Sequence, residues 1–262
     1  MHTYYSFTEA LIRTMAKQQL AAAQWPDDLE LRYSLNSCQG DGVSFTGTLS
    51  TADLLRLLPM LKARGLLSRE VASTLQLFIP LHHATVQLAC RSHRYSHSGT
   101  VKLVAHDIPE AFEAAETMLL EALNCEYEAI CARTEARGYR IIAATYPEET
   151  GETLLVRRTA NIELRAIVAE PCALGYCDDE EKTLQEYLAL IEDGARVPGI
   201  EMQVWCNGQL MAQSWIEHVV IRPGTPARAW LHLEEIAYIA DEARTVITEQ
   251  AEAFRSFLRH AA

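Results

Sequence analysis

Residues 29–49 read LELRYSLNSCQGDGVSFTGTL, and this stretch decides the fold of the chain. On both sides of the central Gly-Asp-Gly, apolar residues alternate with polar ones, as they do in strands with one buried and one exposed face. An Asp-Gly pair between two alternating runs favours a tight hairpin turn, because the turn needs positive φ angles that glycine adopts without strain. The stretch therefore predicts a β-hairpin that turns next to Asp41.

The same alternation predicts two further hairpins. One pairs residues 84–91 with residues 100–105. The other spans residues 202–221 and turns at Asn207–Gly208, a pair that favours a two-residue hairpin turn. A separate strand is expected at 162–168.

Helices are expected between the hairpins, where apolar residues recur every three or four positions. The longest begins at Asp107 and Pro109, two residue types that suit a helix N-terminus. Gly138 is expected to end this helix, and residues 139–145 then predict a strand. The other helices are expected at 6–23, 51–58, from Ser68 onward, 178–193 and 231–259.

Hairpins that alternate with helices predict an α+β fold, in which antiparallel sheets carry long helices on one face. The chain has 262 residues, of which 49% are hydrophobic, enough for two small cores. A polar, turn-rich stretch at 147–152 lies near its middle. We therefore expect two domains, residues 1–150 and residues 151–262, each with its own hairpins and helices.

Acidic residues outnumber basic ones, 35 Asp and Glu against 23 Lys and Arg, which gives a net charge of −12. Proteins that bind nucleic acid gather Lys and Arg to neutralise phosphates, and this chain has no run of basic residues. Direct nucleic-acid binding is therefore not expected. An acidic surface instead favours a protein partner with a basic surface.

The seven cysteines are odd in number and irregularly spaced, with no CxxC pair. This pattern disfavours a disulfide scaffold and fits a reducing compartment. The first residues lack the basic and apolar regions of a secretion signal, and no apolar run reaches the roughly 18 residues of a membrane span. We therefore expect a cytoplasmic protein that does not enter a membrane.

Several motifs resemble a family of small proteins carried by bacteriophages and plasmids. They are SCQGDGVSFTG at 37–47, RSHRYSH at 91–97, LNCEYE at 123–128, and Tyr139 ahead of an acidic turn with Gly151. Members of the family share a Ser-Gln-Gly-Asp-Gly-x-x-Phe-x-Gly hairpin, a Gly-x-Tyr-x-His strand end and a helix with Leu-Glu-x-Glu-Tyr-Glu. The resemblance covers residues 29–151, and the second half of the chain extends past the usual family length.

The resemblance implies a protein of a mobile element in a bacterial host, and some members of the family are labelled as antitoxins. Three positions depart from the family pattern. Cys38 replaces a small or aromatic residue, Ser92 stands where glycine is usual, and Ser98 stands where glutamate is usual. If the motif forms a charged site, the missing glutamate weakens that site in this chain.

The hairpin turn supplies the first candidate binding residues. Gln39 and Asp41 could hold a ligand or a partner's polar group beside the exposed amides of the turn. In the alternative interpretation, Asp41 has only a structural role, and its side chain forms hydrogen bonds with the backbone of its own turn. Tyr95 or His97 could orient the turn through a hydrogen bond from the neighbouring hairpin.

Two acidic runs supply the second set of candidates. Their members are Glu148, Glu149, Asp178, Asp179, Glu180 and Glu181. Such runs could dock into a groove lined by arginine and lysine, or mimic phosphate charge. In the alternative, they are only a solvated loop and the acidic start of a helix.

No motif predicts catalysis or a bound cofactor. Cys90, His93 and His97 have a spacing that could serve zinc, but no second pair lies at a matching distance, so no metal is expected. The sequence has no nucleophile elbow, no phosphate-binding glycine loop and no HExxH motif. We therefore expect a protein that is not an enzyme and has no cofactor.

These observations favour an acidic binding protein, encoded by a mobile element, that inhibits a host defence complex by stoichiometric protein–protein binding. A CRISPR effector, as in anti-CRISPR proteins, or a restriction system is the expected target. One alternative is an antitoxin that neutralises a toxin partner. Another is a small hydrolase that uses Gln39, Asp41 and His97.

Overall fold

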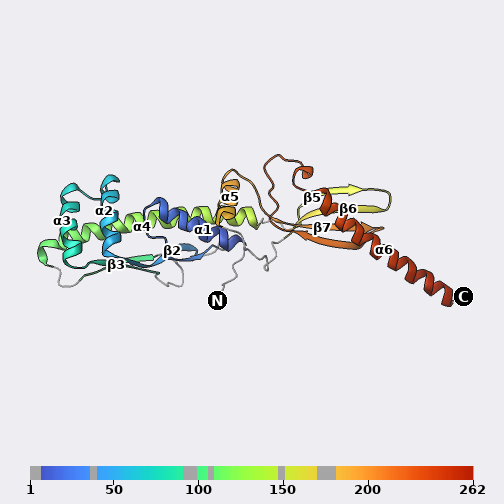
Figure 1. Cartoon of the computed structure of the whole chain (residues 1–262), viewed down its shortest axis with the longest axis horizontal. Helices are drawn as coiled ribbons and strands as arrows, with labels where there is room; N and C mark the ends of the chain where they lie inside the picture. Colours follow the sequence, from blue (N-terminus) through green and yellow to red (C-terminus); the bar gives the residue numbers. More distant parts are fainter. Residues whose placement is uncertain are drawn as a thin grey trace. The chain divides into compact units, whose positions relative to one another are not determined.

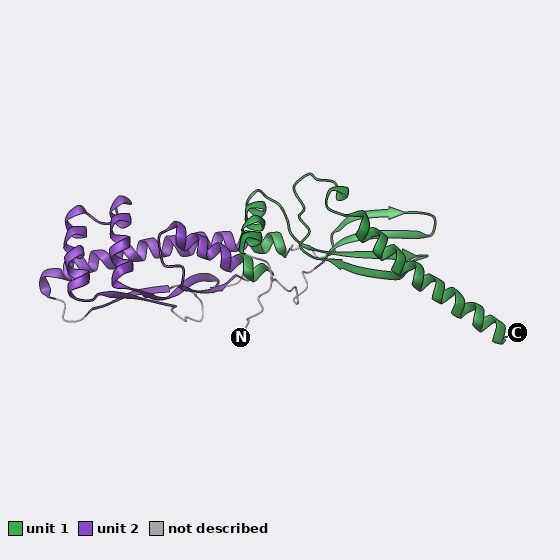
Figure 2. Ribbon diagram, viewed as in Figure 1, with its two compact units in different colours: residues 1–11, 140–262 green, residues 12–139 purple. Residues whose placement is uncertain are grey.

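The computed structural model describes residues 7–35, 40–90, 99–105, 109–146, 151–169 and 181–261. The chain divides into two compact units, which Figure 2 colours separately. Unit 2 is Ile12–Tyr139, and unit 1 joins Met1–Leu11 to Arg140–Ala262. Each unit contains one four-stranded antiparallel sheet together with helices, which confirms the predicted α+β fold in two halves.

Unit 2 has the order helix, hairpin, two short helices, hairpin, long helix (Figure 1). From the N-terminus, the elements are α1 (Phe7–Ala22), β1 (Glu30–Ser34), β2 (Gly42–Leu49), α2 (Thr51–Ala63), α3 (Arg69–Leu81), β3 (Thr85–Cys90), β4 (Gly99–Val104) and α4 (Glu110–Thr145). The strands pair in the order β1-β2-β3-β4. Both predicted hairpins of this half are thereby confirmed, and α1 and α4 each continue from one unit into the other.

The two short helices, α2 and α3, are stabilised by serine caps at their N-termini and by buried leucines. Ser50 and Ser68 precede α2 and α3, and each hydroxyl accepts the backbone N–H three residues later at 3.2 Å. These bonds satisfy N–H groups that have no partner within a helix. In α2, Leu54, Leu57 and Leu61 recur every three or four residues and are fully buried, so one face of the helix belongs to the core.

The strand predicted at 139–145 is wrong, because α4 continues as a helix to Thr145. Thr134 and Ile141 are both buried, and together with Gly138 they keep the helical spacing of the preceding core residues. Gly138 lies inside the helix because Leu35 packs against its backbone. A Cβ at this position would come within 2.5 Å of Leu35 Cδ1. The glycine thus provides room for a neighbour, and it does not end the helix.

A tyrosine of α4 completes the sheet of unit 2. Strand β2 pairs with β3 only from Gly47 to Leu49, so Phe45 has no strand partner on that side. The Tyr127 hydroxyl lies there instead. It accepts a hydrogen bond from the Phe45 N–H at 3.0 Å and donates one to the Phe45 carbonyl at 2.9 Å. A Cβ at Gly99 would collide with this hydroxyl, so glycine at the start of β4 makes room for the tyrosine.

Unit 1 repeats the order hairpin, helix, hairpin, helix. Its elements are β5 (Thr153–Arg158), β6 (Ile162–Ala169), α5 (Glu181–Glu192), β7 (Gly199–Cys206), β8 (Gln209–Ile216), a 3-10 turn (Ala227–Ala229) and α6 (Leu233–Ala261). The strands pair in the order β5-β6-β7-β8. The predicted turn at Asn207–Gly208 is confirmed, with φ angles of 52° and 80°, which suit a two-residue hairpin loop.

The core of unit 1 lies between this sheet and α6. Val168, Met202 and Val204 point to one face of the sheet, where Ile239 and Ala243 of α6 pack against them. Because side chains alternate along a strand, the residues between these positions point to the opposite face. In the described part of the chain, no helix combines the length and apolar character that crossing a bilayer would require.

Candidate binding face

Most of the predicted site residues lie outside the described residues. These are Gln39, Tyr95, His97, Glu148, Glu149, Asp178, Asp179 and Glu180. The same holds for His93 of the zinc spacing considered above. Among the residues that the structure describes, no group of three or more His, Cys, Asp or Glu side chains could hold a metal ion.

Asp41, which the structure does describe, joins the first hairpin to α4. One carboxylate oxygen accepts a hydrogen bond from the Ser34 hydroxyl at 3.1 Å. The other accepts a short hydrogen bond from the Tyr139 hydroxyl of α4. Both carboxylate oxygens thus have hydrogen-bond partners within unit 2. These bonds explain the aspartate at this position by a structural role in holding the turn.

Glu181 is the first residue of α5 and is exposed. Its carboxylate accepts a hydrogen bond from the Gln185 amide at 3.4 Å, one helical turn later. An acidic residue in the first turn of a helix also interacts favourably with the helix dipole. These local interactions explain Glu181 without a ligand.

A different acidic surface lies on α4. Five glutamates of its N-terminal two thirds reach solvent, and no lysine or arginine occurs between residues 110 and 132. These glutamates are Glu110, Glu113, Glu116, Glu121 and Glu128. Much of the negative charge of the described surface of unit 2 is thus carried by one helix, which sequence reasoning from short acidic runs did not identify.

The buried hydroxyl of Tyr127 and the half-buried thiol of Cys131 lie close together in unit 2. Burial raises the pKa of the Cys131 thiol to about 12, and it also raises the pKa of Tyr127. A thiol reacts as its thiolate, so Cys131 is protonated and a poor nucleophile at neutral pH. The hydroxyl supports the fold through Phe45, and the raised pKa leaves the thiol with little thiolate at neutral pH.

The sheet of unit 1 presents an open face on the side opposite α6. We call it the outer face. Its residues are Val156, Arg158, Glu163, Arg165, Ile167, Glu201, Gln203, Trp205, Gln213 and Trp215, which the strand register places side by side. All of them are exposed or half-buried, whereas the alternate residues Ala166, Val168, Met202 and Val204 are buried.

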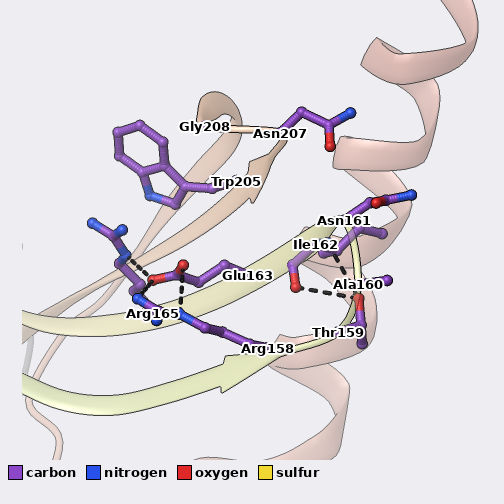
Figure 3. A pocket seen from close by; sticks show the side chains of 10 residues that line it. All are labelled: Arg158, Thr159, Ala160, Asn161, Ile162, Glu163, Arg165, Trp205, Asn207 and Gly208. Atoms are coloured by element: carbon purple, nitrogen blue, oxygen red, sulfur yellow. Dashed lines mark hydrogen bonds and ion pairs between the residues drawn. The ribbon is translucent and has the colours of Figure 1, made fainter.

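Two arginines on the outer face share one carboxylate. Arg158 Nε donates to Glu163 at 2.8 Å, and Arg165 Nε donates to the other oxygen of the same carboxylate at 2.5 Å (Figure 3). The hydrogen bonds from Arg165 and then Arg158 lower the pKa of Glu163 below its ordinary value. Glu163 therefore stays ionised and holds both guanidinium groups in place.

A second network fixes the tryptophan of β7. The indole N–H of Trp205 donates to Gln203 at 2.8 Å, and the Gln203 amide donates to Glu201 at 2.8 Å. The guanidinium of Arg165 lies 4.9 Å from the centre of the Trp205 ring, within the range of a cation–π interaction. The indole is therefore held at its edge by the hydrogen bond to Gln203 and at its face by the guanidinium of Arg165.

These residues surround a hollow at the end of the sheet where the β5–β6 and β7–β8 turns meet (Figure 3). The hollow has a volume of about 300 Å³ and is lined by Arg158, Glu163, Arg165 and Trp205, together with the turn residues 159–162 and 207–208. In β8, the Trp215 side chain is 51% exposed on the same face. The face thus combines one tryptophan ring held by its neighbours, a second exposed tryptophan ring, and arginines that are already paired with a glutamate.

Sequence reasoning missed this face although its signal was present. The alternation in β6 and β7 places the buried residues at the even positions. The odd positions carry Glu163, Arg165, Glu201, Gln203 and Trp205. An open sheet face rich in arginine, tryptophan and glutamine was therefore readable from the same two strands.

The family model for the C-terminal domain of YubG matches residues 152–258. The match takes in the whole β5–β8 sheet and nearly all of α6. No curated protein and no solved structure matches the chain. The second half of the chain, including the outer face, is therefore similar to this family of C-terminal domains.

Proposed function

We propose that the protein acts by binding another protein, and that the outer face of the β5–β8 sheet makes the central contact. The observation that carries this proposal is an open face on which Trp205, Arg158 and Arg165 are held by their own hydrogen bonds. Tryptophan and arginine are the residues that most often dominate binding energy in protein interfaces. Side chains that are already ordered lose less entropy on binding.

The pairing of charges favours a protein partner over a nucleic acid. A nucleic-acid interface needs basic groups that neutralise phosphates. On the outer face Arg158 and Arg165 are balanced by Glu163 and Glu201, and both arginines already donate to Glu163. A partner that buries Trp205 and Trp215 gains contact with large apolar rings at low electrostatic cost.

For the partner, we propose a host defence complex with a basic surface, a CRISPR effector or a restriction system. The resemblance of the first half to proteins of mobile elements supports this class. The net charge of −12 and the glutamates of α4 also support it, because long-range attraction speeds association with a basic surface. Binding would be stoichiometric, and interference would fall because the complex is occupied.

The proposal is tested with the purified full chain, purified defence complexes and an assay of plasmid interference in cells. We expect one-to-one binding to one complex and reduced interference. Trp215→Ala should weaken binding at least about tenfold, as expected when an interface anchor is removed. Leu77→Ala, which truncates a still more exposed apolar residue in α3 (71% against 51% for Trp215), should bind like the wild type.

Two results would count against the proposal in different ways. Normal interference without binding to any complex tested would remove the defence complex as the partner. Binding that is equally strong in Trp215→Ala, Arg165→Ala and the wild type would show that the outer face is not the contact.

A further inference from the structure

The two arginines of the hollow have hydrogen-bond donors that Glu163 does not use. A guanidinium carries five N–H groups. Glu163 accepts one from Arg165, through Nε at 2.5 Å, and two from Arg158, through Nε at 2.8 Å and Nη2 at 3.3 Å. Within the part of the chain that the structure describes, four N–H groups of Arg165 and three of Arg158 therefore have no acceptor. Both arginines can bond a further acceptor while they keep Glu163.

The hollow is locally positive although the chain is acidic. Its charged lining residues are Arg158, Arg165 and Glu163, two positive charges against one negative charge. Glu201, the other acid of the outer face, does not line the hollow, and its carboxylate accepts the Gln203 amide. The whole chain has a net charge of −12. The hollow therefore attracts a single anionic group and repels a cation, whereas the charge of the whole chain repels a polyanion such as nucleic acid.

The geometry of the available donors suits a carboxylate. Arginine binds a planar carboxylate through two parallel N–H···O bonds, which makes the pair both strong and specific. The Arg165 guanidinium is tied to Glu163 through Nε and lies 4.9 Å from the centre of the Trp205 ring. These contacts fix the side chain before any ligand arrives, so that little conformational entropy is lost on binding.

The size and the walls of the hollow indicate what the carboxylate is attached to. A volume of about 300 Å³ is at the lower limit of ligand pockets, and it has room for one side chain with its neighbouring backbone. Figure 3 shows the Trp205 ring on one side and the turn residues Asn161 and Asn207 on the other. The indole offers a flat apolar surface on which an apolar side chain can pack. A peptide segment in which a carboxylate lies next to an apolar side chain meets both conditions.

We propose that the hollow binds a carboxylate of the partner protein through Arg165 and Arg158, while the apolar side chain next to that carboxylate packs on Trp205. That the carboxylate belongs to a protein rests on the proposed function, whereas the preference for a carboxylate rests on the lining of the hollow alone. The C-terminus of the partner and an aspartate or glutamate side chain both supply this chemistry, and the experiment distinguishes them.

The test is fluorine NMR of the full chain labelled with 5-fluorotryptophan, which gives four signals for the four tryptophans. Trp205 reports on the hollow, and Trp215, which lies on the same face but does not line the hollow, is the internal reference. The probes are N-acetylphenylalanine, with a terminal carboxylate, N-acetyl-Phe-Glu-amide, with a side-chain carboxylate, and N-acetylphenylalanine amide, with none. We expect a carboxylate probe to shift the Trp205 signal with a Kd of about 1 mM, as for other ligands of this size. The carboxylate probe that binds more tightly identifies the source, and the amide should leave the signal in place.

Substitutions test the two arginines. Arg165→Gln should weaken binding of the tighter probe at least about tenfold, because hydrogen bonds to a charged group are lost, and Arg158→Gln should weaken it as well. Arg157→Gln is the matched control, since Arg157 is the preceding residue of β5, is exposed and does not line the hollow. It should bind the probe like the wild type. An unshifted signal from Trp230, which is buried in the core of unit 1, verifies that each variant is folded.

Three results would overturn the proposal. They are a Trp205 signal that neither carboxylate probe shifts, an equal shift with the amide or with sodium phosphate at the same ionic strength, and unchanged binding in both Arg165→Gln and Arg158→Gln. None of these results concerns the contact of Trp215 with a partner. Conversely, a partner that binds Trp215→Ala and the wild type equally would count against the proposed function and leave the carboxylate site of the hollow in place.

Discussion

Replacing Tyr127 by phenylalanine removes one oxygen atom from the core of unit 2 and should cost much of its stability. The hydroxyl is the hydrogen-bond partner of both the N–H and the carbonyl of Phe45, at 3.0 and 2.9 Å. The ring of Tyr127 is fully buried. In the Tyr127→Phe variant, two buried backbone groups would lose their partner while the packing of the ring is kept.

The size of the effect follows from these two groups. A buried donor or acceptor left without a partner costs about 1–3 kcal/mol, so the pair costs about 2–6 kcal/mol. For a protein of this size, 1 kcal/mol lowers the melting temperature by about 2–4 °C. We therefore expect unit 2 to melt at least about 4 °C lower in the variant.

Thermal unfolding and amide hydrogen exchange would measure this. Tyr238→Phe is the control, since its hydroxyl is on an exposed side chain and its loss should change stability by less than about 0.5 kcal/mol. The Phe45 amide should exchange faster in Tyr127→Phe and at the wild-type rate in the control. An unchanged melting temperature together with a protected Phe45 amide would refute the role of this hydroxyl.

Three further predictions concern charged and reactive groups. Arg64→Met removes the close ion-pair partner of Glu126, which is only 4% exposed; we expect a loss of about 1–3 kcal/mol in urea unfolding, and no loss would contradict the pairing. Iodoacetamide at pH 8 should modify exposed Cys125 much faster than half-buried Cys131, whose pKa of about 12 keeps it protonated. Equal labelling by mass spectrometry would contradict the raised pKa. Because hydrogen bonds from two arginines lower the pKa of Glu163 below its ordinary 4.5, its ion pairs should persist at pH 5 and be lost only as the pH falls through the lowered pKa. An NMR titration with an ordinary midpoint would show that the pairs do not form.

The hairpins could be predicted because their turns have a local cause. Asn207–Gly208 adopts the positive φ angles that its residue types favour, and the alternation on both sides sets the pairing. The first hairpin follows from the same rule, with Asp41 fixed by Ser34 and Tyr139. The hydrogen bond between Tyr139 and Asp41 could be found only from the structure, because the two residues are far apart in the sequence.

The end of α4 could not be predicted because its cause is distant. Gly138 has the composition signal of a helix end, but it serves a contact with Leu35, about a hundred residues earlier in the chain. The partnership of Tyr127 with Phe45 is hidden for the same reason. In both cases the role of the residue depends on a contact with a residue that is distant in the sequence and close only in the folded chain.

The candidate sites show a different limit. The sequence predicted binding residues in the most distinctive motifs, and most of these lie outside the described residues. The outer face consists of residues that belong to no distinctive motif, such as Arg165 and Trp205. They form a candidate site only because the register of β6 and β7 places them side by side. The alternation of polar residues in these strands can be read from the sequence, but the hydrogen bonds between their side chains cannot.

The central claim is that the outer face meets a partner protein, and photocrosslinking in cells tests it most directly. A photoreactive phenylalanine analogue is placed at Trp215 in one variant and at Leu77 in another, both exposed positions. We predict a discrete adduct with one partner protein from position 215, identified by mass spectrometry, and no such adduct from position 77. No adduct at 215, or the same adducts from both positions, would contradict the account.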